Sequence, residues 1–147
     1  MIYQLAIGTA LILTSTLIAG IGFLLLEHLL TRSQAWLLRP PHALKLLFLL
    51  NVAIFWILIM VTVAVWIWAL AYYALGIFIT IEAAVYFSIV SFTTLGFGDI
   101  LLPHQWRLLS GMAAMNGLLM IGFLTAMLVE VLRRVRSIQA ETRDWTS

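Results

Sequence analysis

A run of five residues, Thr-Leu-Gly-Phe-Gly at positions 94–98, is the part of this chain best suited to binding chemistry. Its two glycines stand at alternate positions and permit backbone angles closed to other residues, including positive φ. Such a segment suits a strand whose carbonyl oxygens all point toward one axis. A short helix predicted just before the run would end close to it, and the partly negative end of that helix favours a cation.

Side chains suited to catalysis do not gather in the sequence. No spacing of His, Asp and Glu indicates a metalloenzyme, and no Ser has a nearby base that could activate it. The chain contains no Cys, which excludes disulfides and thiolate metal sites. We therefore expect no enzymatic activity and no organic cofactor.

The elements that must hold residues 94–98 are strongly apolar. Of the 147 residues, 64% are hydrophobic and 10% are charged, and the mean hydropathy is +1.11. Soluble domains are about half apolar and a quarter charged, so the composition excludes a water-soluble fold. The formal net charge is only +2 and the cations stand in short clusters, so we expect a lipid bilayer and no nucleic acid as partner.

Three apolar stretches are long enough to cross a bilayer, which requires about 20 residues of helix. We interpret the whole chain, 1–147, as a single transmembrane domain. Its predicted parts are a first helix over about 4–30, a second over 44–75, a re-entrant segment over 80–99, a third helix over 106–132 and a short cytoplasmic tail over 133–147.

Cationic residues set the predicted orientation. They stand between the first and second helices and after the third, at Arg32, Arg39, Lys45, Arg133, Arg134 and Arg136. The positive-inside rule places both groups in the cytoplasm. The N-terminus is then outside and the C-terminus cytoplasmic, in a plasma membrane or a bacterial inner membrane.

Aromatic residues mark the predicted outer end of the second helix. They are Trp66, Trp68, Tyr72 and Tyr73, and at that depth they fit an interfacial aromatic belt. Gly76 follows them and is the expected breaking point of this helix.

The segment between the second and third helices is too short to span a membrane and too apolar for an ordinary loop. A helix from Glu82 to Phe92 would be about 16 Å long, half of the ~30 Å hydrocarbon core. A near-extended return over 94–98 covers roughly the same distance. Thr80 can cap the helix, so the segment is predicted to dip into the membrane and return.

The run Thr-Thr-Leu-Gly-Phe-Gly-Asp at 93–99 resembles the Thr-Thr-Val-Gly-Tyr-Gly-Asp signature of potassium channels. The resemblance covers about 82–128, and the third helix is similar to the glycine-hinged inner helix of bacterial channels. It implies an all-α membrane protein with three transmembrane helices, a re-entrant pore helix and an extended selectivity filter. One such loop per chain implies a homotetrameric pore.

The resemblance implies a potassium-selective channel that conducts K⁺ passively through backbone carbonyl groups. The implied ligands of K⁺ are the carbonyl oxygens of Thr94, Leu95, Gly96 and Phe97, with the Thr94 hydroxyl at the innermost site and Gly98 ending the filter.

Residues beyond the filter would form the outer mouth. The resemblance places Asp99 there, and Leu101 at a position that is aromatic in relatives sensitive to tetraethylammonium. Tyr86 could support the filter as a hydrogen-bond partner of Asp99.

Two departures from the signature keep alternatives open. Leu95 replaces the usual Val, and Phe97 replaces Tyr, which removes a hydroxyl that anchors the filter in many relatives. A weakly selective cation channel is therefore one alternative. The other is a non-conducting auxiliary subunit of a larger channel.

Four residues of the third helix each allow two interpretations. Asn116 could face a cavity below the filter or hydrogen-bond a neighbouring helix. Gly117 and Gly122 fit a hinge or, as we favour, close helix packing. Glu130 could form an acidic ring at the inner mouth, although a surface pair with Arg133 or Arg134 is favoured.

Overall fold

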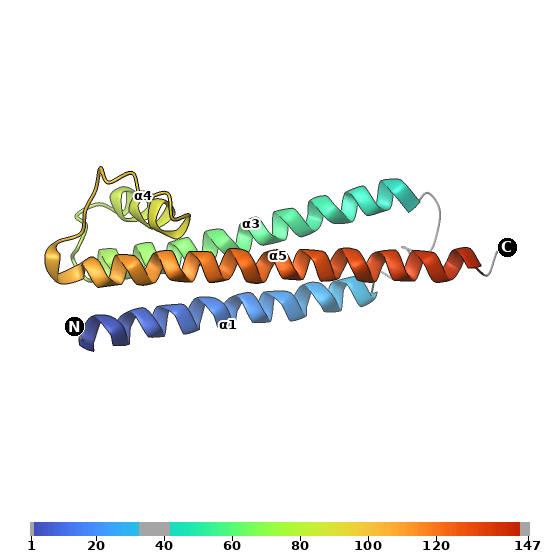
Figure 1. The fold of residues 1–147 in the computed structure, drawn as a ribbon, viewed down its shortest axis with the longest axis horizontal. Helices are drawn as coiled ribbons and strands as arrows, with labels where there is room; N and C mark the ends of the chain where they lie inside the picture. The colour runs from blue at the N-terminus through green and yellow to red at the C-terminus, as the bar shows by residue number, and fades with distance from the viewer. Residues whose placement is uncertain (1, 33–41, 145–147) are drawn as a thin grey trace.

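The computed structural model describes residues 2–32 and 42–144, and long helices account for most of this part of the chain. The elements, in chain order, are α1 (Ile2–Arg32), α3 (His42–Ala74), α4 (Ile81–Phe92), the 3-10 turn η1 (His104–Trp106) and α5 (Arg107–Asp144). Figure 1 shows α1, α3 and α5 as one elongated bundle, with α4 lying against the end where α3 finishes and α5 begins.

Three of these helices are long and apolar enough to cross a membrane. The spans are Ile2–Arg32, Leu44–Ala74 and His104–Arg134. They confirm the three predicted transmembrane helices, and the chain is an integral membrane protein with an all-α fold. The helix α5 continues to Asp144, so most of the predicted tail extends the third helix.

The predicted cationic clusters lie at one end of the bundle. In Figure 1, α1 ends, α3 begins and α5 ends on the same side, where Arg32 closes α1 and Arg134 pairs with Glu27. Arg39, which belongs to the predicted cluster, lies outside the described residues. A shared end is what the positive-inside interpretation requires.

The second transmembrane helix ends where the sequence predicts. Its last helical residue is Ala74, and Gly76 adopts a φ of +67°. The Gly76 N–H donates to the Tyr73 carbonyl at 3.0 Å, and the Ile77 N–H donates to the Tyr72 carbonyl at 3.1 Å. This pair of bonds around a left-handed glycine closes the helix with a Schellman motif.

An aromatic core joins α3, α4 and α5. Tyr72 meets Phe87 of α4 edge to face, with ring centroids 5.4 Å apart, and its hydroxyl donates to the Leu109 carbonyl of α5 at 3.4 Å. Trp68 and Tyr72 are fully buried, so the belt predicted for them is wrong. They hold α4 in place, because buried aromatic rings contribute large contact areas.

The first helix packs through a seam of small residues. Gly8 faces Met112 of α5, and a Cβ added at Gly8 would lie 2.4 Å from the Met112 sulfur. Gly22 faces Met60 of α3 in the same way, with a corresponding distance of 2.5 Å. Small residues let helices approach closely inside a membrane, so α1 is a packed part of the bundle.

Candidate functional site

The helix α4 begins with the predicted cap. Thr80 has extended backbone angles, and its side-chain oxygen accepts a hydrogen bond from the Ala83 N–H at 3.3 Å. Glu82 stands in the first turn, where its charge complements the positive end of the helix dipole. These local interactions stabilise the start of α4 at this position.

The far end of α4 meets α5 close to the middle of its membrane span. A Cβ added at Gly117 would lie 1.8 Å from the Phe92 carbonyl oxygen, so the two backbones are in direct contact. Gly117 comes ten residues after the start of α5 at Arg107, which corresponds to about 15 Å of helix. That depth is half of the ~30 Å hydrocarbon core, as expected for a re-entrant helix.

The backbone after α4 alternates in handedness. Thr94, Gly96 and Gly98 have φ values of +58°, +54° and +77°, whereas Leu95 and Phe97 have negative φ. Successive carbonyl groups of an extended chain point to opposite sides, and reversing φ at every second residue turns them toward the same side. The predicted extended return is therefore a segment of alternating φ, which favours a single row of oxygens.

Thr94 is the one non-glycine residue with positive φ in the described chain. For a β-branched side chain that conformation is a true outlier. Strain of this kind persists where the surrounding structure imposes it, and it concentrates at functional sites.

The start of this segment is bound to the end of α4. The Thr94 N–H donates to the Ser91 carbonyl at 3.0 Å, while the N–H groups of Leu95 and Gly96 donate to the Val90 carbonyl at 3.0 and 3.3 Å. Within the described residues, no hydrogen bond reaches a carbonyl oxygen of residues 94–98. Residues 93–99 are also exposed in the single chain.

One hydrogen bond fastens the distal end of the segment. The Tyr86 hydroxyl donates to an Asp99 carboxylate oxygen at 2.6 Å, so the partnership raised by the sequence is present. This bond lowers the pKa of Asp99 below its ordinary value, because it stabilises the charged carboxylate. Leu101, two residues on, is 72% exposed.

The segment is not packed against α5 along its whole length. A cavity of about 310 Å³ lies between them, lined by Gly96 and Gly98 on one side and by Arg107 and Ser110 on the other. The conformation of residues 94–98 therefore depends on their hydrogen bonds to α4 and on the Tyr86–Asp99 hydrogen bond.

Asn116 lies in the contact between α5 and α1. Its side chain is fully buried, and its amide nitrogen donates to the Ser15 hydroxyl of α1 at 2.7 Å. Asn116 therefore has the partner on a neighbouring helix that one of the two interpretations expects, while its side-chain oxygen is buried without a hydrogen-bond partner. The polar Ser15 in an apolar helix was the available signal for this partner.

The two glycines of the third helix differ in their surroundings. Gly117 is closely packed on the backbone of Phe92. Gly122 is exposed, and nothing lies within 4 Å of a Cβ added to it. Close packing at Gly122 is therefore absent from the described chain.

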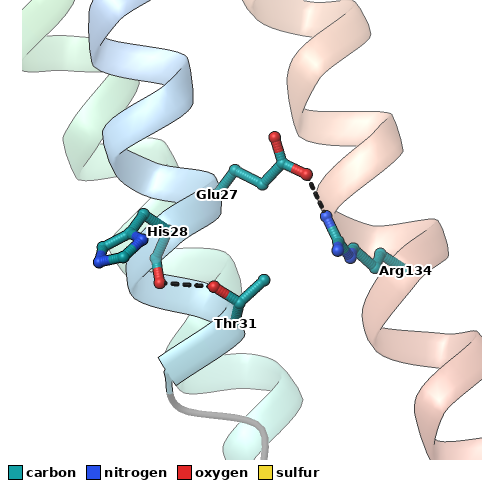
Figure 2. Close-up of polar contacts among 4 residues, drawn as sticks. All are labelled: Glu27, His28, Thr31 and Arg134. Carbon is teal, nitrogen blue, oxygen red and sulfur yellow. Dashed lines mark hydrogen bonds and ion pairs between the residues drawn. The ribbon is translucent and has the colours of Figure 1, made fainter.

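The charged residues near the end of the third span separate into two ion pairs. Glu130 lies 4.0 Å from Arg133 in the same helix, and both side chains are largely exposed. Arg134 instead pairs with Glu27 of α1, as Figure 2 shows. Sequence reasoning missed this partner, because Glu27 precedes Arg134 by 107 residues.

Comparison with known proteins finds a family whose model matches this chain. Residues 58–134, more than half of the chain, match a family model described as ion channel. The match includes α4, residues 93–99 and most of α5, and it leaves α1 outside. No curated protein and no solved structure matches the chain.

Proposed function

Because the chain belongs to this family of ion channels, we propose that it is the subunit of a homotetrameric, potassium-selective channel. The observation that carries the proposal is the row of unpaired carbonyl groups at residues 94–98, held by alternating φ. Non-helical backbone at membrane depth is tolerated where it lines water or is buried in protein. Four such segments around one axis would satisfy both conditions.

The proposed conduction path uses backbone oxygens as substitutes for water. Thr94, Leu95, Gly96 and Phe97 each contribute a carbonyl oxygen, and rings of these oxygens replace the hydration shell of K⁺. The Thr94 hydroxyl forms the innermost site. The C-terminal end of α4 points toward the same region, and its partly negative charge favours a cation.

The proposed orientation puts Asp99 and Leu101 at the outer mouth. The cationic end of the bundle is then cytoplasmic, with the N-terminus outside, in a plasma membrane or a bacterial inner membrane. A carboxylate at the outer mouth attracts cations, and the hydrogen bond from Tyr86, which lowers the pKa of Asp99, favours its charged form.

A weakly selective cation channel is the second candidate, because Phe97 carries no hydroxyl to anchor the filter. The Phe97 ring is 65% exposed in the single chain. A non-conducting auxiliary subunit is the third candidate.

Purified protein in planar bilayers separates these candidates. Current that reverses near the K⁺ equilibrium potential under K⁺ and Na⁺ gradients supports the proposal. Reversal near zero with K⁺ on one side and Na⁺ on the other indicates weak selectivity. Absence of current from a preparation that cross-links as a tetramer supports the auxiliary subunit.

A further inference from the structure

The first helix, which lies outside the family match, is bound to the third transmembrane helix at three levels. At one end the Gln4 side-chain amide donates to the Gln105 carbonyl just before α5. In the middle Ser15 accepts the bond from Asn116. At the other end Glu27 pairs with Arg134. In Figure 1, α1 follows α5 along the bundle in the same direction.

The half of α5 that contains Arg134 is out of reach of α4, since α4 ends at Phe92 beside Gly117. Figure 1 also shows that the first turns of α3 diverge from α5 at this end, whereas α1 stays beside it. Figure 2 shows the Glu27 carboxylate and the Arg134 guanidinium facing each other across the gap between α1 and α5. The ion pair is therefore a principal polar contact holding the inner end of α5.

We propose that α1 is a regulatory helix whose Glu27–Arg134 ion pair holds the inner end of α5 in one position, so that the pair sets the open probability of the pore. The inference rests on the proposed function. It concerns the conformational equilibrium of the channel and leaves ion selectivity to residues 94–98.

The exposure of the pair suits it to this role. The two side chains are 39% and 40% exposed, and ion pairs of this exposure contribute only modestly to stability. Such a contact biases an equilibrium by about twofold in each subunit. If four subunits open together, their biases multiply to about tenfold or more. A pair of this strength can be broken and re-formed during gating.

Charge exchange in planar bilayers tests the proposal. We expect Glu27→Arg and Arg134→Glu each to change open probability by about tenfold or more, and the double variant Glu27→Arg/Arg134→Glu to restore it. The K⁺ to Na⁺ reversal potential stays unchanged in all three. Arg136→Glu is the matched control, because it makes the same charge change at an exposed position two residues further along α5.

A contact measurement keeps the inference separate from the proposed function. The chain has no Cys, so a Glu27→Cys/Arg134→Cys variant can be joined by a short bifunctional thiol reagent without background. Cross-linking within one chain, together with a changed open probability, supports the proposed role of the Glu27–Arg134 pair. Unchanged open probability in the single charge variants of a conducting channel overturns it while the proposed function stands. If the unmodified protein does not conduct, the proposed function is overturned, and the inference that rests on it falls with it.

Discussion

Replacing Gly117 by alanine tests whether contact between α5 and the end of α4 positions the filter. The added Cβ would lie 1.8 Å from the Phe92 carbonyl oxygen and 2.6 Å from its carbonyl carbon. A carbon and an oxygen in contact are normally about 3.3–3.6 Å apart, so the helices must separate by roughly 1.5 Å. Both partners are backbone, so no side chain can rotate away.

The cost can be estimated by comparison with a glycine that has free space. Overpacking of this kind costs about 1–3 kcal/mol, in every subunit. Gly122→Ala in the same helix meets nothing within 4 Å, and it should gain about 0.5–1 kcal/mol from helix propensity. The propensity gain is common to both variants, so we expect them to differ by the overpacking cost of about 1–3 kcal/mol in free energy of unfolding per subunit.

Two measurements check this expectation. Denaturation in detergent should show a lower stability for Gly117→Ala and an unchanged or higher one for Gly122→Ala. Bilayer recording should show lost K⁺ selectivity in Gly117→Ala alone, because Phe92 stands two residues before the filter. Equal stability of the two variants would refute the reasoning from the Phe92 contact.

Three further predictions address the filter and its outer mouth. Gly96→Ala should abolish K⁺ selectivity in reversal-potential measurements, because a Cβ at a φ of +54° costs about 1 kcal/mol or more per subunit; Gly76→Ala, at +67° outside the filter, should leave selectivity intact. The pKa of Asp99 is lowered by Tyr86, so their bond is present at neutral pH and is lost as the pH falls through that lowered pKa; Tyr86→Phe should shift the acid loss of K⁺ current to higher external pH, and coinciding curves would contradict this. Leu101 is 72% exposed, so Leu101→Tyr should create external tetraethylammonium block worth about 0.5–2 kcal/mol, whereas the unmodified channel should resist it.

The parts of the fold that depend on local interactions could be predicted from the sequence. Helix lengths follow from uninterrupted apolar runs, and the cap at Thr80 and the break at Gly76 depend on neighbouring residues alone. The re-entrant segment follows from length and hydropathy. The two glycines indicate that positive φ is possible at positions 96 and 98. The positive φ of Thr94 could not be predicted, because its β-branched side chain disfavours that conformation.

Contacts between distant segments could not be predicted, because hydropathy does not separate lipid-facing from protein-facing positions in a membrane helix. Trp68 and Tyr72 are fully buried, whereas their neighbours Trp66 and Tyr73 are 43% and 44% exposed. All four are Trp or Tyr, the residue types typical of an interfacial aromatic belt. The packing of α3 against the other helices, and not hydropathy, determines which of these aromatic rings enter the core.

Small and polar residues carry the packing information that hydropathy lacks. Four of the five buried residues of α1 are glycine, alanine or serine, at Gly8, Ser15, Ala19 and Gly22, and this pattern identifies the face that contacts protein. It does not identify the partner, since Gly8 meets α5 while Gly22 meets α3. The partner is fixed by complementary groups, such as Ser15 with Asn116, whose amide needs a hydrogen bond inside the membrane. A face made of small residues therefore permits close approach, and the polar side chains within it determine the register in which α1 meets α5.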